Sequence, residues 1–412
     1  MRVAAIILAG GQGTRLQPLT IHHSKPAVSY GGRYRLIDIP ISNSLNSNFH
    51  QIFVITQYLP EELCEHVIQT YRFNSKNPGF IKILSPQQNE KGEIQCYGGT
   101  ADAVRKNLSS IFKESDADYF LILSGDQLYN IDFREMVAFA KSKNAELTIG
   151  SVIVSEKEAC RMGLLKIDAT NLVTDFVEKP KETDVLRKFE FSGSAEAPST
   201  PLYLGSMGMY VFKRETLCSL LHTDGRNDFG YHLITTAVKR GNTSAYVYRG
   251  YWEDIGTVSS YYEANLNLIH SNKGLNTYDL SKPIYTRPTF LPGPKIKNAR
   301  ISQSIICEGC IVEAEEISNS IIGFRSHIKQ GTIIRNTVMM GNHFCDNREL
   351  DCWIGENCHI EKVIIDEQVL IGDGVKITNK SKHINFDGEG IFVRDGITII
   401  TAGTKIPSHY EF

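Results

Sequence analysis

The chain has 412 residues, of which 42% are hydrophobic and 22% are charged, and its formal net charge is −2. This length predicts more than one domain, and the near-neutral charge excludes a general electrostatic attraction to nucleic acid or to an anionic membrane surface. No apolar run approaches the roughly 18 residues of a membrane span, and none has the pattern of a secretory or transit segment. We therefore expect a cytoplasmic protein.

The nine cysteines are scattered along the chain in no paired framework, which indicates reduced thiols. Cys307 and Cys310 have the spacing of a metal-binding pair, but no second pair stands at a spacing suited to a zinc site. We expect these two residues to be small structural thiols.

The first predicted element is a strand at Val3–Leu8, an apolar run that leads directly into a glycine-rich loop, Gly10–Gly13. Glycines let backbone N–H groups approach an anionic ligand closely, and Arg15 and Lys25 add two positive charges after the loop. Neither the dinucleotide-binding fingerprint nor the P-loop spacing is present. The segment predicts a cradle for the phosphates of a nucleoside triphosphate; the alternative is an ordinary glycine turn after a strand.

Strand and helix signals then alternate over roughly the first 270 residues, which predicts a mainly parallel sheet flanked by helices. In such sheets, ligands bind beyond the carboxyl ends of the strands, where Gly10–Arg15 and Asp126 both fall. The predicted strands are Gln51–Thr56, Tyr119–Leu123 and Glu146–Val154, and the predicted helices are Pro60–Tyr71, Thr100–Phe112 and Asp132–Lys143.

Beyond a proline-rich stretch, an aliphatic residue recurs every six positions, which is typical of a hexapeptide β-helix whose coils bury their aliphatic residues by stacking. His343–Asp351 is expected to form a loop that interrupts the stack, and the alternative to a β-helix is a set of short strands in a sandwich. The recurring positions are Ile305, Ile311, Ile317, Ile322, Ile328, Ile334, Met340, Ile354, Ile360, Ile365, Ile371 and Ile377.

Two carboxylates are placed to hold a metal ion. Asp126 closes the predicted strand Tyr119–Leu123, and Asp254 follows the strand pattern Ala245–Tyr251. Beside a triphosphate cradle, such a pair would bind Mg²⁺ together with phosphate oxygens, although a single aspartate at a strand end is often only a helix cap.

An acidic and a basic residue precede a proline at Glu178–Pro180. Because proline restricts the turn, Glu178 and Lys179 project from a defined backbone, and the pair suits a sugar phosphate: a carboxylate for hydroxyls and an ammonium for the phosphate. The alternative is an exposed salt pair in a turn.

Together these motifs identify a family: from residue 3 to about residue 407 the chain resembles the ADP-glucose pyrophosphorylases of the bacterial and plant type. Two of the matching segments, YRLIDIP and GTADAV, are more specific to this family than the glycine loop. The segments that carry the resemblance are Gly10–Thr20 (GGQGTRLQPLT), Lys25–Val28 (KPAV), Tyr34–Pro40 (YRLIDIP), Gly99–Val104 (GTADAV), Ser124–Tyr129 (SGDQLY), Glu178–Pro180 (EKP), Ser206–Tyr210 (SMGMY), Asn227–Gly230 (NDFG) and Tyr251–Thr257 (YWEDIGT).

The resemblance implies a fold and a reaction. The fold is an α/β domain with a Rossmann-like, mixed and mainly parallel sheet over residues 1–275, a linker at 276–299, and a left-handed parallel β-helix at 300–412 that serves oligomerisation and regulation. The reaction converts ATP and glucose 1-phosphate to ADP-glucose and pyrophosphate with Mg²⁺, for glycogen or starch synthesis. A homotetramer is implied, with room for a small-molecule allosteric effector.

The resemblance also implies a role for individual residues. Those that contact the nucleotide are Leu8, Ala9, Gly10, Gly11, Gly13, Thr14, Gln88, Gly99 and Thr100. Those that bind glucose 1-phosphate are Gly163, Glu178, Lys179, Ser206, Asp228 and Trp252. Arg15, Lys25, Asp126 and Lys179 are the implied catalytic residues, and Asp126 and Asp254 are the implied Mg²⁺ ligands.

The chain departs from the family pattern where effectors act. His22 and His23 replace a lysine–arginine pair, and the region before GTADAV, where relatives carry a tryptophan, reads Gln95-Cys96-Tyr97-Gly98. Lys405 is displaced from the position of an activator lysine, although Lys380 keeps a neighbouring basic position. The effector therefore stays open.

Three other functions also stay open. One is an enzyme of the same fold that uses another nucleoside triphosphate, and a second is a non-catalytic regulatory subunit. A third is an acyltransferase activity in the β-helix with His327, His343 or His359 as base, for which packing and subunit contact are the simpler explanation.

Overall fold

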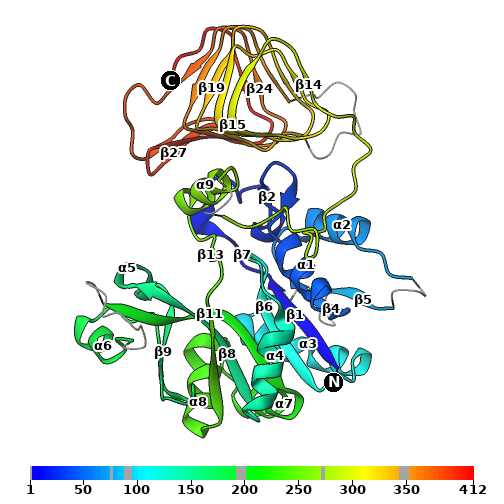
Figure 1. Cartoon of the computed structure of the whole chain (residues 1–412), viewed down its shortest axis with the longest axis vertical. Helices are drawn as coiled ribbons and strands as arrows, with labels where there is room; N and C mark the ends of the chain where they lie inside the picture. Colours follow the sequence, from blue (N-terminus) through cyan, green and yellow to red (C-terminus); the bar gives the residue numbers. More distant parts are fainter. Residues whose placement is uncertain (1, 75–77, 88–94, 192–200, 271–273, 343–351) are drawn as a thin grey trace.

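The computed structural model describes residues 2–74, 78–87, 95–191, 201–270, 274–342 and 352–412. Figure 1 shows two parts, a sheet flanked by helices and a prism of short parallel strands. Gln88 and the expected loop His343–Asp351 lie outside the described residues.

The sheet is built around β1 (Val3–Ala9), which lies between β4 (Gln51–Thr56) and β6 (Tyr119–Ser124) and is parallel to both. β5 (Phe80–Leu84) continues the parallel half beyond β4. On the other side, β11 (Leu202–Lys213) runs antiparallel to β6 and begins the mixed half. That half also contains β8 (Leu147–Ser155), β9 (Gly163–Ile167), β10 (Val173–Glu178) and β12 (Thr243–Tyr248).

Side-chain alternation along β1 builds two cores. Successive residues of a strand point to opposite faces of the sheet, so Ala5 and Ile7 join one hydrophobic cluster while Ala4 and Ile6 join the other. All four residues are fully buried, which explains why the strand reads as one continuous apolar run rather than an alternating one.

Helices cover both faces of the sheet. One face is covered by α1 (Asp38–Asn46), α2 (Pro60–Thr70), α4 (Phe133–Ser142) and α9 (Val258–Asn267). The other is covered by α3 (Thr100–Glu114), α7 (Arg214–Thr223), the π-helical turn η3 (Phe229–Ile234) and α8 (Thr235–Arg240). Two short helices, α5 (Glu156–Ala159) and α6 (Thr183–Lys188), lie near β9 and β10 (Figure 1).

One predicted strand is wrong in its extent. The pattern Ala245–Tyr251 predicts a single strand, but β12 ends at Tyr248 and the chain then enters a separate short strand, β13 (Trp252–Asp254). β13 pairs antiparallel with β7 (Gln127–Tyr129), so that Asp254 lies opposite Gln127. This small ribbon, rather than the main sheet, brings Asp254 next to Asp126.

The prism confirms the predicted six-residue period. Parallel pairing stacks the coils, and the inward aliphatic residues of successive coils, such as Ile328 and Ile354, are fully buried. Its strands are β14 (Lys295–Ile296), β15 (Arg300–Ile306), β16 (Ile311–Val312), β17 (Glu316–Ile322), β18 (Ser326–Ile328), β19 (Ile333–Arg335), β20 (Val338–Met339), β21 (Cys352–Ile354), β22 (His359–Glu361), β23 (Val363–Ile365), β24 (Leu370–Ile371), β25 (Lys376–Ile377) and β29 (Lys405–Ile406), with β26 (Phe386–Asp387), β27 (Ile391–Arg394) and β28 (Ile397–Ile400) forming antiparallel pairs near the end.

The first coil departs from the predicted inward positions. Ile311 is 37% exposed whereas its neighbour Val312 is fully buried, because Val312 pairs with the inward Ile328 and Ile311 with the outward His327. Ile305 is likewise only half-buried. The boundaries 1–275, 276–299 and 300–412 stay a prediction; β14 lies in the expected linker and pairs with β16.

The two parts share one hydrophobic core. Ile364 and Ile399 of the prism belong to the same cluster as Ile7 of the central strand and Tyr261 of α9. Figure 1 shows α9 and the β2 (Ser29–Tyr30) turn directly beneath the prism. The prism is therefore packed against the sheet domain rather than tethered by its linker alone.

A buried ion cluster reinforces this interface. The guanidinium of Arg35, 1% exposed, lies 2.7 Å from Glu62 of α2 and 3.2 Å from Glu367, which follows β23 of the prism. The imidazole of His23 lies 2.6 Å from the second oxygen of Glu62. Buried charges require such partners, so the cluster fixes how the prism sits on the sheet domain.

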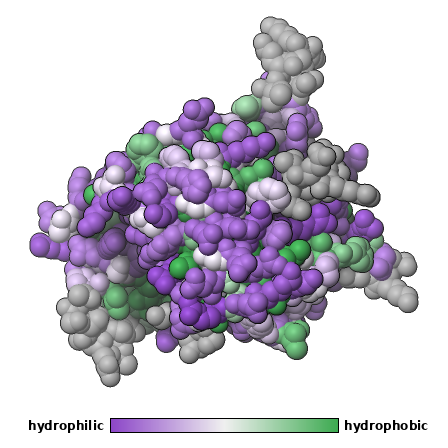
Figure 2. Space-filling model, turned by 90° about the horizontal axis from the view of Figure 1, so that it is seen from above, coloured by the Kyte–Doolittle hydropathy of each residue, from purple (hydrophilic) through white to green (hydrophobic). Residues whose placement is uncertain are grey.

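The surface seen from the prism side is mostly hydrophilic, with hydrophobic residues in small separate groups (Figure 2). Within the described ranges, no helix combines the length and the apolar character that crossing a bilayer requires.

Candidate active site

A cavity of about 490 Å³ opens at the carboxyl edge of the parallel strands, where β1, β4 and β6 end. Nine predicted site residues line it, namely Leu8, Gly10, Gly11, Gly99, Thr100, Asp126, Glu178, Lys179 and Asp228. Predicted nucleotide-side and sugar-side residues therefore meet in one cavity, as expected for an edge of this kind.

The loop after β1 has the backbone that a cradle requires. Gly13 has a φ of 65°, and a Cβ on it would come within 3.0 Å of Lys25 and Thr20, so glycine is required there. The Thr20 hydroxyl donates a 2.8 Å hydrogen bond to the Gly13 carbonyl and holds the loop. A Cβ on Gly11, in contrast, would meet no atom within 4 Å, so the space beside it is open to a ligand.

Lys25 and Asp126 form the charged centre of the site. Lys25, in the 3-10 turn η2 (Lys25–Ala27), is 8% exposed and places its Nζ 2.6 Å from Asp126 Oδ2. Burial alone would raise the pKa of Asp126, but Lys25 and a hydrogen bond from the Ser124 hydroxyl lower it. The Asp126 carboxylate is thus ionised and partnered at neutral pH.

Asp254 reaches the same centre from β13. Part of Asp254 is exposed to solvent. Its carboxyl has a raised pKa, because the surrounding protein removes water from it and because Asp126 is negatively charged. Arg15, in the 3-10 turn η1 (Thr14–Leu16), counters this effect with its own charge and lies beside Gly256.

The pair Asp126 and Asp254 fits a hard divalent cation that keeps phosphate or water oxygens as its other ligands. Burial and the negative charge of Asp126 both raise the pKa of Asp254, and a bound cation would offset both effects. Among the described residues, no three or more metal-ligating side chains come together, so phosphate or water oxygens would complete the coordination of an ion held by this pair.

The sugar-side residues gather where β10 ends. Burial and the nearby Asp228 raise the pKa of Glu178, whereas Lys179, 3.2 Å away, lowers it. Asp228 caps η3 by accepting a 3.0 Å hydrogen bond from the Tyr231 amide. Two carboxylates and an ammonium at one wall of the cavity can bind hydroxyls and a phosphate of the same ligand.

Three predicted sugar-side residues lie behind this wall. A Cβ on Gly163 would come within 2.7 Å of the Glu178 carboxylate, so Gly163 gives that side chain its room. Ser206 is 8% exposed and accepts a hydrogen bond from the Gly208 amide. Trp252 donates through its indole N–H to the Gln127 side chain, 3.3 Å away.

The nucleotide side is completed by the start of α3. Gly99 precedes this helix, and a Cβ on it would come within 2.4 Å of the Asn227 carbonyl. The Thr100 hydroxyl accepts from the Phe229 amide at 3.0 Å. Thr100 therefore ties the nucleotide wall to the segment that carries Asp228. Ala9, the buried last residue of β1, and the exposed Thr14 flank the loop without lining the cavity.

Several other lining residues were not predicted from the sequence, and Gln57 and Tyr97 are two of them. Gln57 follows β4, and its side chain accepts a 2.6 Å hydrogen bond from the amide of Tyr97. The signal for Gln57 was present, because β4 is parallel to β1 and its carboxyl end must lie at the same edge. Tyr97 gives no comparable signal, since it lies in a loop with no regular pattern.

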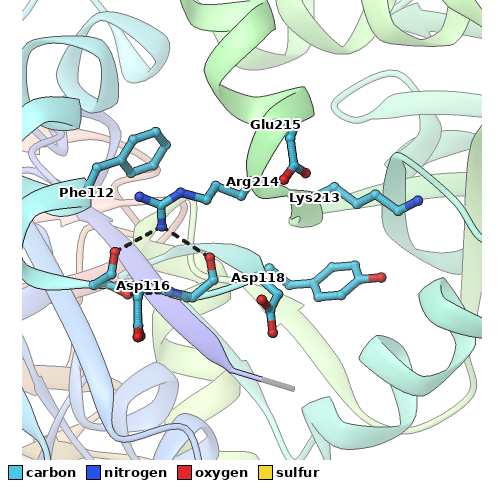
Figure 3. A pocket seen from close by; sticks show the side chains of 9 residues that line it. Phe112, Asp116, Asp118, Lys213, Arg214 and Glu215 are labelled. Carbon is cyan, nitrogen blue, oxygen red and sulfur yellow. Dashed lines mark hydrogen bonds between the residues drawn. The ribbon is translucent and has the colours of Figure 1, made fainter.

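A second cavity, of about 370 Å³, lies at the opposite end of β6 (Figure 3). The guanidinium of Arg214 lies in this cavity and is bound by neighbouring groups. It donates hydrogen bonds to the carbonyls of Ser115 and Ala117, at 2.9 and 3.3 Å, and lies 4.1 Å from the centre of the Phe112 ring. Because these contacts join α7 to the turn before β6, the cavity is part of the scaffold.

Comparison with known families identifies both the sheet domain and the prism. Residues 4–271 match the nucleotidyl transferase family, and residues 289–410 match the GLGC left-handed parallel β-helix domain. The resemblance noted in the sequence is thereby confirmed. The chain belongs to the nucleotidyl transferase family, as a sugar nucleotidyltransferase of the GLGC type with the two-domain architecture of ADP-glucose pyrophosphorylase.

Proposed function

We propose that the protein is a glucose-1-phosphate adenylyltransferase, which makes ADP-glucose and pyrophosphate from ATP and α-D-glucose 1-phosphate for the synthesis of an α-glucan such as glycogen or starch. The observation that carries this proposal is that one cavity is lined by the glycine loop, by Asp126, and by Glu178 and Lys179. A triphosphate cradle and a sugar-phosphate wall in one cavity place the two substrates within reach of each other.

The reaction needs no general base. An oxygen of the sugar phosphate, already anionic at neutral pH, attacks the α-phosphorus of ATP, and the bond from that phosphorus to the pyrophosphate oxygen breaks. Lys25, which pairs with Asp126, and Arg15, whose charge acts on Asp254, would bind the triphosphate and neutralise the charge on the departing pyrophosphate. Positioning and charge neutralisation are then the whole of the protein's contribution.

Asp126 and Asp254 are the residues that would hold Mg²⁺, which supplies charge neutralisation at the phosphates when bound. The pairing of Lys25 with Asp126 gives the lysine a second role, because an ammonium released from the carboxylate can turn to a phosphate oxygen. Glu178 and Asp228 would accept hydrogen bonds from the sugar hydroxyls while Lys179 binds the sugar's phosphate.

We further propose a cytoplasmic homotetramer whose subunits meet in part through the prism. In support, Ile311 and Trp353 occupy outward positions in register on the two sides of His327 and are 37% and 43% exposed. Exposed apolar residues aligned on one sheet face suit burial in a subunit contact. Light scattering on the purified protein would give the subunit number directly. A small-molecule effector also stays a proposal.

The test is pyrophosphate release by purified protein with Mg²⁺ and glucose 1-phosphate, with ATP, UTP, dTTP and GTP supplied separately. Asp126→Asn removes the proposed metal ligand and should lower kcat by about 100-fold or more, the size expected for one electrostatic contributor. Asp168→Asn is the matched control, since Asp168 is an exposed turn carboxylate that does not line the cavity.

The outcomes separate the alternatives. Turnover with ATP alone, lost in Asp126→Asn and kept in Asp168→Asn, supports the adenylyltransferase. Turnover with another nucleotide would replace ATP in the proposal. Absence of turnover with every nucleotide, in folded protein supplied with common sugar-phosphate effectors, would favour a non-catalytic regulatory subunit.

A further inference from the structure

The backbone fixes where the side chain of Lys179 begins but not where its ammonium lies. Lys179 follows β10 with a φ of 47°, its amide donates a 3.1 Å hydrogen bond to the Met162 carbonyl, and Pro180 comes next. The side chain is 48% exposed at the wall of the cavity. A lysine side chain is a flexible four-carbon stem, so a half-exposed ammonium needs further contacts to keep one position.

Two neighbours hold that ammonium. The Glu178 carboxylate lies 3.2 Å from Lys179 Nζ, and the centre of the Tyr231 ring lies 5.6 Å from it. A cation within about 6 Å of an aromatic ring centre is attracted by the negative face of the ring. This attraction uses none of the ammonium's three N–H donors, so the donors that do not face Glu178 stay free for phosphate oxygens.

Tyr231 is itself held in place at the edge of the site. It lies in η3 directly after Phe229 and Gly230, which line the cavity, and its amide donates to the Asp228 carboxylate at 3.0 Å. Its side chain is nevertheless 52% exposed. A tyrosine that is about half exposed adds little to core packing, and its ring lies beside the Lys179 ammonium.

We propose that Tyr231 is a positioning residue for Lys179, whose ammonium it holds at the wall of the cavity in place to bind the phosphate of the sugar phosphate. This inference rests on the proposed function and extends it to a residue outside the matching motifs. Without the ring, the ammonium is free to turn into solvent or to pair fully with Glu178. Affinity for the sugar phosphate then falls, while the chemistry at Asp126 is unaffected.

The first experiment measures KM for glucose 1-phosphate and kcat for the wild type, Tyr231→Ala and Tyr231→Phe. Tyr231→Ala should raise this KM about two- to fivefold, the effect of one partly exposed cation–π contact, with kcat and KM for ATP unchanged. Tyr231→Phe keeps the ring and should behave as the wild type. Tyr278→Ala removes an 80% exposed tyrosine that does not line the cavity and is the matched control.

A double-mutant cycle with Lys179→Met tests whether the ring acts through the lysine. In that background, Tyr231→Ala should change the KM for glucose 1-phosphate by less than about twofold. A full effect in the absence of Lys179 would mean that the ring touches the substrate directly, and it would overturn the positioning role. An unchanged KM in Tyr231→Ala, or an equal loss in Tyr231→Phe, would overturn it as well.

The proposed function and this inference can fail separately. An active wild type whose KM is indifferent to Tyr231→Ala refutes only the inference. If the wild type turns over no nucleotide, calorimetric titration of glucose 1-phosphate into the same variants gives the answer instead. Weaker binding by Tyr231→Ala than by the wild type would then support the inference, and absence of binding to the wild type would overturn it.

Discussion

The ammonium of Lys25 lies 2.6 Å from the carboxylate of Asp126, and both side chains are largely shielded from solvent, at 10% and 21% exposed. The residue that we propose as a phosphate ligand therefore pairs with the residue that we propose as a metal ligand. An ammonium and a divalent cation compete for the same carboxylate, so a metal gains Asp126 most easily when phosphates offer Lys25 another partner.

This competition predicts how Lys25→Met behaves. Removing the ammonium should strengthen binding of Mn²⁺ by the protein alone about tenfold, because Asp126 and Asp254 then lose the cation that competes for Asp126, and Arg15 compensates their charge only in part. The same change should lower kcat by about 100-fold or more through loss of phosphate neutralisation. Electron paramagnetic resonance of free Mn²⁺ measures the first effect and pyrophosphate release measures the second.

The double variant Lys25→Met with Asp126→Asn is the control, since it removes the carboxylate for which the two cations compete. It should bind Mn²⁺ no better than the wild type. If Lys25→Met alone leaves the affinity for Mn²⁺ unchanged, the ion pair does not regulate access to Asp126.

Tyr97 provides a prediction for the nucleotide side. Tyr97 lines the cavity, its amide donates to the Gln57 side chain, and the Lys106 ammonium lies 5.9 Å from the centre of its ring. A ring held in this way offers a face to a nucleobase, and stacking of this kind contributes about 0.5–1.5 kcal/mol. Tyr97→Ala should therefore raise the KM for ATP about two- to tenfold and Tyr97→Phe should not. A loss confined to the KM for glucose 1-phosphate would place the base elsewhere.

The His23 cluster at the domain interface predicts a pH dependence of stability. Burial on its own would lower the pKa of His23, but its hydrogen bond to Glu62 and the charges of Asp366 and Glu367 raise it from the ordinary 6.5 to about 9. The folded protein therefore binds a proton that the unfolded chain releases between these values. The resulting stabilisation is complete below about pH 6.5 and is lost as the pH rises to about 9.

Urea unfolding of the wild type and His23→Gln at several pH values measures this contribution. The difference in free energy of unfolding should be on the order of 2–3 kcal/mol at pH 6 and should shrink towards zero at pH 10. His22→Gln, at an exposed neighbouring position, should keep the pH dependence of the wild type. A difference that is independent of pH would show that His23 contributes by packing instead.

Short-range patterns in the sequence located most of the scaffold. β4 has the predicted bounds Gln51–Thr56, and α3 starts at the predicted Thr100, because hydrophobic periodicity and glycine positions are local properties of the chain. The glycine loop and Asp126 could be placed in one site for the same reason, since the carboxyl ends of parallel strands share an edge.

The features that could not be predicted from the sequence depend on which of two similar adjacent residues faces inward, or on contacts between residues far apart in the chain. A period of six does not decide whether Ile311 or Val312 faces inward, because both are aliphatic and the choice depends on pairing with β18. The contact between Arg35 and Glu367 joins residues more than three hundred positions apart, and no local pattern announces it. The course of the chain from β12 into β13 likewise depends on pairing with β7.

Close packing between the sheet domain and the prism predicts the effect of a single methyl group. Gly32 has a φ of 68°, and a Cβ on it would lie 2.8 Å from the Gly323 backbone and 3.2 Å from the Cys307 sulfur. Gly32→Ala should therefore lower the free energy of unfolding by about 2–4 kcal/mol, through backbone strain and forced separation of the two surfaces. Gly403→Ala has a positive φ with no atom within 4 Å of the added Cβ, so it should cost only about 1 kcal/mol.

The reactivity of Cys307 distinguishes the two effects of Gly32→Ala, namely the steric clash with the prism and the strain of the backbone at residue 32. The Cys307 thiol is 5% exposed, and burial raises its pKa, so it should react slowly with a thiol reagent in the wild type. If Gly32→Ala pushes the prism away from the sheet domain, mass spectrometry should find Cys307 labelled much faster in this variant, whereas Gly403→Ala should leave its rate unchanged. Equal labelling of Cys307 in all three proteins would mean that the interface accommodates the extra methyl group by local adjustment. The buried ion cluster, rather than the close approach of Gly32 and Gly323, would then hold the two parts together.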